Sequence, residues 1–220
     1  MAEVDFISLV HKSTTRDYLA RVTEYPKADA AEKARQWAYD YWDGDRRTGY
    51  GGMRYDGRWR KVADAMVERY GIKPGDRILD VGCGKGFLLY DFTQAVPGVS
   101  VAGIDVSEYA IANAKEEVRP FLQRGHARQL PFADDSFDLV VSINTLHNLY
   151  NYELFDALKE IERVGRGDKF ICVESYRTEQ EKVNLLYWQL TCEAFCTPAE
   201  WQWWFDQTGY TGDHGFIYFE

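Results

Sequence analysis

From residue 77 onward, the chain alternates between short β-branched runs and segments with helical spacing. The predicted strands and helices, in chain order, span 77–81, 87–95, 99–104, 107–118, 137–143, about 153–164, and 169–173. Strands that alternate with helices are typical of an α/β fold, a parallel sheet with helices on both faces. Ligands of such sheets bind outside the carboxyl ends of the strands, where the strand order reverses. The loops that follow the predicted strands are therefore the first places to search for a site.

Composition narrows the class of protein before any motif is considered. The 220 residues are 45% hydrophobic and 15% aromatic, with 18 Gly and 6 Pro, which is the composition of a folded globular protein. The formal net charge of -9 provides no broad positive field for a phosphate backbone, so nucleic acid is a disfavoured partner. No stretch approaches the roughly 18 apolar residues of a membrane span. We expect a cytoplasmic protein with no membrane partner, and its four cysteines without a disulfide framework agree with a reducing compartment.

The pattern changes near residues 71–76, which predicts two parts. Before this point, segments 27–42 and 56–70 have helical spacing, and 41–55 has no sustained period. We predict an N-terminal helical extension over 1–71 and a main α/β domain over 72–220.

Two further helices are predicted over about 179–195 and 198–208, as an insertion at about 175–208. The second begins with Thr197-Pro198-Ala199-Glu200, which is typical of a capping box. The Gly-containing segment 212–215 before Phe216-Ile217-Tyr218-Phe219 predicts a short terminal β-hairpin. Aromatic residues, Trp188 among them, concentrate near both ends of the chain, where they can form core, a homodimer contact or a wall of the acceptor pocket.

The most informative motif is Asp80-Val81-Gly82-Cys83-Gly84-Lys85-Gly86, between a predicted strand and a predicted helix. Alternating glycines allow a tight turn and the approach of a ligand to the backbone. Phe87 stands where a dinucleotide fingerprint would have its last glycine, so a pyrophosphate cradle is not reproduced. The spacing instead suits a nucleoside-like cofactor with no phosphate at the start of the helix.

Two more segments support a nucleoside-like ligand. Asp105 follows the second predicted strand, and a carboxylate there can accept hydrogen bonds from both ribose hydroxyls. The segment from Gly125 to Phe132 can place backbone amides and an apolar side chain along an adenine ring.

Together these segments, from about residue 72 to residue 173, resemble the class I S-adenosylmethionine-dependent methyltransferases of small-molecule type. The resemblance implies a Rossmann-like, seven-stranded, mostly parallel sheet, with the N-terminal helical extension acting as a lid. It implies S-adenosylmethionine as the cofactor and no metal. In the family, the acid at Asp105 holds the ribose. The other candidate cofactor residues are Asp80, Gly82, Cys83, Gly84 and Gly86 around the methionine part, Val106, His126, Ala127 and Arg128 towards the adenine, and Asn144. His126 stands where the family often has Asp, so that adenine contact must change or move.

Three residues are candidates for the chemistry. His147 lies just beyond the fourth predicted strand, in a segment that resembles the L-H-x-L sequence of many small-molecule methyltransferases, and it is the first candidate for a general base. The alternative is that His147 packs against a helix and bonds the backbone. Glu174 follows the fifth strand and can orient a substrate amine, act as base, or cap the next helix. Tyr176 lies at the same rim.

The aperiodic N-terminal segment supplies the candidate acceptor residues. It is rich in glycine, aromatic residues and arginine, which suit hinging, desolvation and the binding of a carboxylate. These candidates are Tyr50, Arg54, Tyr55, Arg58 and Trp59. The alternative is an irregular structural connection.

The sequence thus predicts methyl transfer to an oxygen or nitrogen of a small metabolite or biosynthetic intermediate. A protein methyltransferase and a non-catalytic S-adenosylmethionine-binding subunit are the alternatives. The identity of the acceptor cannot be read from the sequence.

Overall fold

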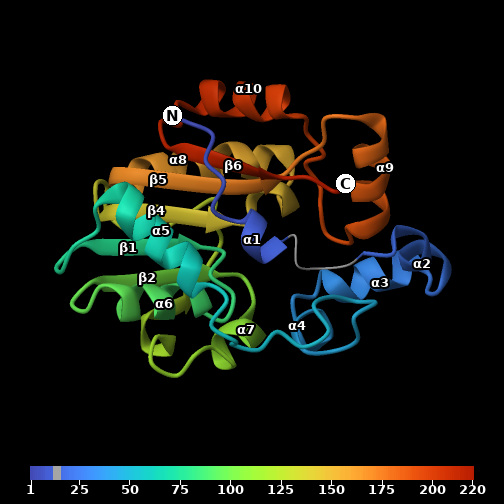
Figure 1. The fold of residues 1–220 in the computed structure, drawn as a ribbon, viewed down its shortest axis with the longest axis horizontal. Helices are drawn as coiled ribbons and strands as arrows, with labels where there is room; N and C mark the ends of the chain where they lie inside the picture. The colour runs from blue at the N-terminus through green and yellow to red at the C-terminus, as the bar shows by residue number, and fades with distance from the viewer. Residues whose placement is uncertain (12–15) are drawn as a thin grey trace.

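The computed structural model describes residues 1–11 and 16–220, and within these residues six strands form one sheet (Figure 1). The order is β3-β2-β1-β4-β5-β6, and every neighbouring pair is parallel. The strands are β1 (Arg77–Val81), β2 (Ser100–Asp105), β3 (Leu122–Arg124), β4 (Phe137–Ile143), β5 (Gly165–Glu174) and β6 (Asp213–Ile217). The order reverses between β1 and β4, so the loops after these two strands diverge and leave a crevice. The α/β fold with a parallel sheet is confirmed.

The prediction of seven strands with a terminal hairpin is wrong. Residues 213–217 form the single strand β6, which pairs in parallel with β5 from Phe170↔Asp213 onward. Gly215, expected in a hairpin turn, instead lies in this ladder, where an added Cβ would meet the Val4 carbonyl oxygen at 2.6 Å. Glu3 forms a parallel bridge to His214, so the N-terminal residues continue the sheet beyond β6. Glycine at position 215 therefore reflects close packing of backbones, which local sequence does not distinguish from a turn.

Helices cover both faces of the sheet. On one face lie α5 (Arg60–Tyr70) and α6 (Phe87–Ala95), whose Met66 and Phe92 are fully buried in one core cluster. On the other face lie α8 (Asn151–Val164) and α10 (Pro198–Thr208), and Trp201 is fully buried in the second cluster. The predicted capping box of α10 is confirmed, with reciprocal bonds between Thr197 and Glu200. A homodimer through the aromatic ends stays a prediction.

The remaining helices are α1 (Ser8–His11), α2 (Tyr18–Thr23), α3 (Lys27–Ala34), α4 (Tyr39–Trp42), α7 (Glu108–Ala112), α9 (Glu179–Trp188) and the 3-10 turns η1 (Arg119–Phe121) and η2 (Leu146–Asn148). Several of these, including α1–α4 and α9, lie at the end of the molecule towards which the strands point (Figure 1). The predicted helix over 27–42 is broken, because Trp37 adopts a left-handed conformation with φ of 51° between α3 and α4. None of the helices within the described ranges has the length and apolarity needed to cross a bilayer. The division of the chain at residue 71 stays a prediction, and α5 packs against α6 in the sheet core.

Candidate active site

Two adjoining cavities lie at the carboxyl ends of the strands. The glycine-turn cavity, about 410 Å³, is lined by the turn after β1, Asp105 at the end of β2 and the loops after β3 and β4. The arginine cavity, about 320 Å³, contains His147, Glu174 and five arginines. Asn144 and Tyr50 line both cavities, so the two spaces meet at these side chains. Both cavities are of the size that binds small molecules.

The glycine turn owes its shape to positive φ angles, 88° at Gly82 and 53° at Gly84. The space that a Cβ would need is filled by other parts of the chain. A Cβ at Gly82 would lie 1.9 Å from the Thr145 hydroxyl, and one at Gly84 would lie 2.8 Å from the Trp42 ring. The glycines therefore let the loop after β4 and the helix α4 close onto the turn, which explains them without a ligand at either Cβ position.

Asp105 organises the start of this cavity. Its carboxylate accepts hydrogen bonds from the backbone N–H groups of Gly84 and Ser107, both at 2.8 Å. Burial raises the pKa of Asp105 even though these N–H groups favour its charged form. Burial and the neighbouring Asp105 raise the pKa of Asp80 to about 8. Each Asp105 oxygen uses one lone pair on the backbone, so a second lone pair on each oxygen remains for a ligand hydroxyl.

Most of the predicted cofactor residues lie around this cavity. Those that line it are Asp80, Gly82, Cys83, Gly84, Asp105, Val106, His126, Ala127 and Asn144. Two predicted residues lie elsewhere. Gly86 caps α6 and faces Val118 and Leu122, and Arg128 is exposed with its guanidinium 3.4 Å from Glu153.

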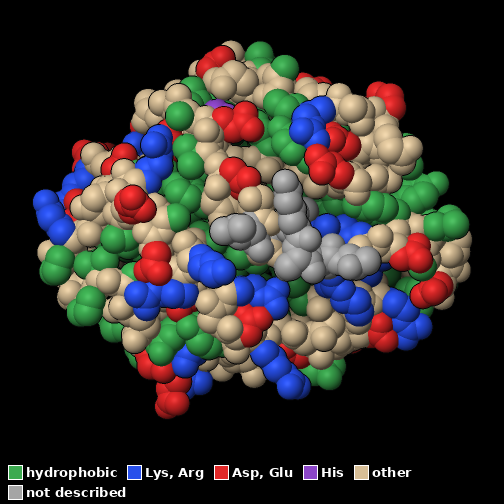
Figure 2. All heavy atoms as spheres, in the orientation of Figure 1, with side chains coloured by type: hydrophobic (Ala, Val, Ile, Leu, Met, Phe, Trp, Pro, Cys, Tyr) green, Lys and Arg blue, Asp and Glu red, His purple; other side chains and the backbone are tan. Residues whose placement is uncertain are grey.

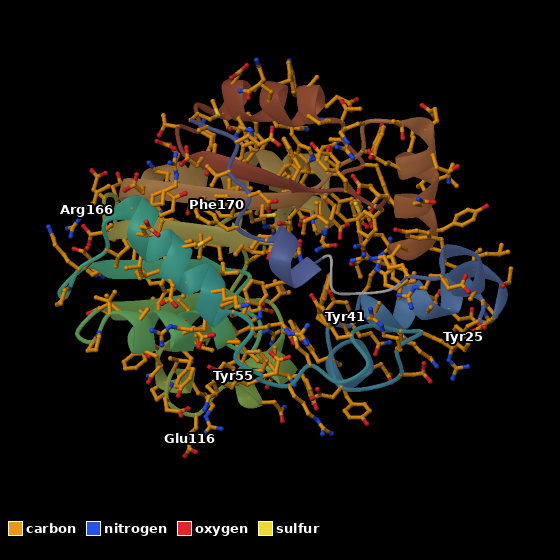
Figure 3. All side chains as sticks on the ribbon, in the orientation of Figure 1. Tyr25, Tyr41, Tyr55, Glu116, Arg166 and Phe170 are labelled. Atoms are coloured by element: carbon orange, nitrogen blue, oxygen red, sulfur yellow. The ribbon has the colours of Figure 1, made fainter. Side chains whose placement is uncertain are left out.

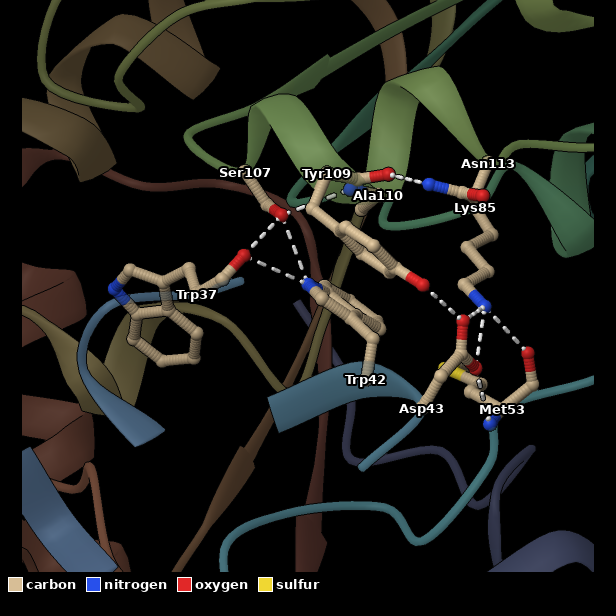
Figure 4. Close-up of polar contacts among 9 residues, drawn as sticks. All are labelled: Trp37, Trp42, Asp43, Met53, Lys85, Ser107, Tyr109, Ala110 and Asn113. Carbon is tan, nitrogen blue, oxygen red and sulfur yellow. Dashed lines mark hydrogen bonds and ion pairs between the residues drawn. The ribbon is translucent and has the colours of Figure 1, made fainter. Parts of the chain in front are cut away.

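A network of polar contacts ties the N-terminal segment to the cofactor-side loops (Figure 4). The Lys85 ammonium donates to both Asp43 carboxylate oxygens at 2.7 Å and to the Met53 carbonyl at 2.9 Å. Tyr109 donates to the same carboxylate at 2.8 Å, and the Trp42 indole donates to the Ser107 hydroxyl at 2.8 Å. Burial alone would raise the pKa of Asp43, but the bonds from Lys85 and Tyr109 outweigh it and lower that pKa. Residues 42–53 are thus fastened over the glycine turn.

Breaking this network is expected to loosen the N-terminal segment. In Asp43→Ala, the Lys85 ammonium, only 5% exposed, loses its ion pair, so we expect the free energy of unfolding to fall by about 2–3 kcal/mol. Trypsin should then cut faster at Arg46 and Arg47. Asp45→Ala, which removes an exposed pair with Arg47, is the matched control, and equal cleavage rates in the two variants would contradict a fastening role.

The arginine cavity contains most of the predicted chemistry and acceptor residues. His147, Glu174, Arg54 and Arg58 line it, and Tyr50 and Trp59 line both cavities. Two predicted residues lie apart from it. Tyr55 donates a 2.6 Å hydrogen bond to Asp91 on α6, and Figure 3 shows it well separated from Tyr41, which lines both cavities. Tyr176 packs against the core, with the Lys182 ammonium over its ring.

His147 and Glu174 form a buried pair, 2% and 4% exposed. The Glu174 backbone N–H donates to His147 Nδ1 at 3.4 Å, so the neutral imidazole carries its proton on Nε2, which lies 3.4 Å from Glu174 Oε2. Burial lowers the pKa of His147 to about 3 and raises that of Glu174 to about 8. Gln189 also donates to the other carboxyl oxygen of Glu174. At neutral pH both members of the pair are therefore mainly uncharged.

Two buried oxygens of residues that line the arginine cavity have no hydrogen-bond partner within the described part of the chain. They are Asn144 Oδ1 and Glu174 Oε2. Asn144 also has a left-handed backbone with φ of 56°, an uncommon conformation for a residue other than glycine. A buried polar atom without a partner is costly, and a ligand N–H or O–H group would satisfy Asn144 Oδ1.

Several residues that line the two cavities were not predicted from the sequence. In the glycine-turn cavity these include Trp37, Trp42 and Lys85, and in the arginine cavity they include Arg16, Arg21, Arg46 and Gln189. Lys85 stands inside the glycine motif and was open to prediction. The others come from irregular or short helical segments with no motif, and only the tertiary fold brings them together.

Part of the chain is similar to known methyltransferases. Residues 79–173 match the model of a family described as a methyltransferase domain. Two curated relatives are named demethylmenaquinone methyltransferase. The protein from Symbiobacterium thermophilum is 34% identical over 145 residues, covering 60% of this chain and 57% of that protein. The protein from Bacillus cytotoxicus is 33% identical over 148 residues, covering 62% and 60%. The chain thus spans less than two thirds of the length of these relatives.

Solved structures with this fold include the YcgJ protein from Bacillus subtilis, with a TM-score of 0.55 and 23% identity, covering 66% of each chain. The BH2331 protein from Bacillus halodurans has a TM-score of 0.56 and 20% identity, covering 67% of this chain and 68% of that one. At these identities, the likeness establishes the shared fold.

Proposed function

We propose that this chain, whose residues 79–173 match a methyltransferase domain, is a class I S-adenosylmethionine-dependent methyltransferase that moves a methyl group from S-adenosylmethionine to an oxygen or nitrogen of a small molecule. The observation that carries the proposal is the meeting of two cavities at Asn144. One is built on the glycine turn and Asp105, and the other contains the buried pair His147 and Glu174.

The residues of the glycine-turn cavity fit S-adenosylmethionine. Asp105 has free lone pairs for the two ribose hydroxyls at the end of β2, and Ala127 gives the loop after β3 an apolar surface for the adenine. His126 lies beside the Glu153 carboxylate, 3.6 Å away, so Glu153 can replace the missing aspartate as acceptor for the adenine amine. When bound, the cofactor would supply an electrophilic methyl group attached to a sulfonium sulfur. This sulfur would leave as a neutral thioether when the methyl group is transferred.

On the acceptor side, the geometry favours Glu174 over His147 as the base. Both nitrogens of His147 face Glu174, and a pKa of about 3 makes the imidazole a weak base. Glu174 lines the arginine cavity, its Oε2 has no hydrogen-bond partner among the residues described, and its pKa of about 8 suits proton transfer near neutral pH. In this proposal Glu174 takes the proton from the attacking oxygen or nitrogen, Asn144 orients that group, and His147 positions Glu174.

A small acceptor is supported by the size of the arginine cavity and by the relatives, whose names refer to demethylmenaquinone. The chain covers less than two thirds of those relatives, and the acceptor side is built mainly from residues outside 79–173, so their acceptor is not carried over. The proposal places the enzyme in the cytoplasm, with neither nucleic acid nor membrane as a partner.

The function is tested with S-adenosylmethionine that carries a labelled methyl group. The chain should bind the cofactor by calorimetry and transfer label to the low-molecular-mass fraction of a bacterial extract. Label in the protein fraction alone would indicate a protein methyltransferase, and binding without transfer would indicate a non-catalytic subunit. Absence of binding would contradict all three.

A further inference from the structure

The arginine cavity contains a cluster of guanidinium groups around one aromatic ring. The guanidinium carbons of Arg16, Arg21 and Arg46 lie 5.4, 5.2 and 5.3 Å from the centre of a Trp188 ring. All four residues line the cavity, and Arg54 and Arg58 line it as well. Figure 2 shows Lys and Arg side chains, interspersed with Asp and Glu, across the lower half of the face that Figure 1 presents. In a chain with a net charge of -9, such a gathering of positive charge requires an explanation.

Arg21 and Arg46 are held in place by neutral groups. Arg21 donates to the carbonyls of Trp188 and Arg46 at 3.1 and 2.7 Å, and Arg46 donates to the carbonyls of Gly49 and Tyr50 at 3.1 and 3.3 Å. Across residues 1–11 and 16–220, neither guanidinium forms an ion pair with a carboxylate. The carbonyls fix the guanidinium groups without neutralising them.

The acids of this cavity do not compensate the charge. Asp56 is already paired with Arg58 at 2.5 Å. Glu174, with a pKa near 8, is mainly protonated at neutral pH. Burial and repulsion from Arg46 lower the pKa of Arg21 to about 10, which reflects like charges forced together. A cavity with several fixed positive charges and no charged acid to spare is complementary to an anion.

The chemistry of the cavity therefore differs between its two ends. Asn144 presents an acceptor oxygen at the junction with the glycine-turn cavity, and this oxygen selects a group that donates a hydrogen bond. The arginine cluster supplies donors and positive charge, and the Trp188 ring supplies an apolar face beside it. One molecule that satisfies both ends carries its nucleophile at one end and an anion at the other.

We propose that the methyl acceptor carries an oxyanionic group, a carboxylate or a phosphate ester, and that Arg21 and Arg46 bind it. This inference rests on the proposed function, because it assigns the substrate class of the same site. Planar guanidinium groups bind carboxylates and phosphates through paired hydrogen bonds, and a neutral acceptor would leave Arg21 and Arg46 without a counter-charge.

Binding of simple anions tests the inference without knowledge of the acceptor. The chain, saturated with S-adenosylhomocysteine, is titrated at constant ionic strength with benzoate, phenyl phosphate or neutral benzamide, and the unfolding temperature is followed. We expect saturable stabilisation by benzoate or phenyl phosphate and none by benzamide. Whichever anion binds more tightly identifies the oxyanion as carboxylate or phosphate.

Variants then locate the anion. Arg21→Gln and Arg46→Gln should each weaken binding of that anion at least about tenfold, and Arg21→Lys should retain part of it. Arg47→Gln is the matched control, because Arg47 is exposed and paired with Asp45 outside the cavity. If a Gln variant fails to fold, Arg54→Gln, which lines the cavity on an exposed segment, should still weaken binding severalfold.

The inference and the proposed function fail differently. Absence of saturable anion binding to the wild-type chain, or binding that all these arginine variants leave unchanged, overturns the oxyanion inference even when S-adenosylhomocysteine binds. If calorimetry shows that S-adenosylhomocysteine does not bind to the wild-type chain, the proposed function, on which the oxyanion inference rests, is overturned.

Discussion

Replacement of Asp105 by asparagine is expected to weaken the binding of S-adenosylhomocysteine by about 10- to 150-fold. Both carboxylate oxygens already accept a backbone N–H, from Gly84 and Ser107. An amide has one oxygen, so the variant must either give up a ribose hydroxyl or turn an NH₂ group towards a backbone N–H. Hydrogen bonds to a charged group are each worth about 1.5–3 kcal/mol, which corresponds to this range of affinity.

Calorimetric titration of wild type and variant measures the loss. Asp76→Asn is the matched control, because the Asp76 carboxylate also accepts a backbone N–H, that of Lys73, in an exposed turn away from the cavity. Equal affinity in Asp105→Asn and Asp76→Asn would remove Asp105 from the ribose site. The circular dichroism spectrum and the unfolding temperature show whether the glycine turn has survived the change.

Much of the sheet core was predictable because its signals are local. The bounds of β1, α6, β4 and α10 agree with the sequence patterns, since apolar runs, spacing and a capping box all lie within the element concerned. The errors occur where distant contacts decide the structure. β6 is a strand because β5 and Glu3 lie on either side of it, and the helix expected over 27–42 breaks at Trp37.

The two cavities of the site also differ in how far local sequence signals predict them. The glycine-turn side was predictable because its residues follow consecutive strands, and the parallel sheet brings their ends to one edge. The arginine cavity draws Arg16 and Arg21 from before α3, Arg46 from after α4, and Trp188 from the end of α9. Nothing in these segments signals their meeting, because each residue taken singly has the pattern of a solvated surface charge or a core aromatic.

The largest effect on turnover is expected from Glu174→Gln. The variant keeps the shape and the bond with Gln189 but cannot take a proton, so we expect kcat to fall by about 100- to 10,000-fold while the affinity for S-adenosylhomocysteine is unchanged. Glu179→Gln, an exposed carboxylate at the start of α9, is the matched control. The measurement uses the acceptor recovered from the labelling experiment.

The pH dependence separates Glu174 from His147 as the base. Burial raises the pKa of Glu174 to about 8, so the carboxylate form grows as pH rises, and the wild-type rate should increase up to about pH 8 and then level off. Glu174→Gln should lose this rise. His147→Gln removes the neighbour of Oε2 but leaves the carboxyl group, so its kcat should fall less and its profile should keep the rise at a shifted pH. If His147→Gln abolishes turnover and Glu174→Gln retains the wild-type profile, the imidazole is the base in spite of its lowered pKa.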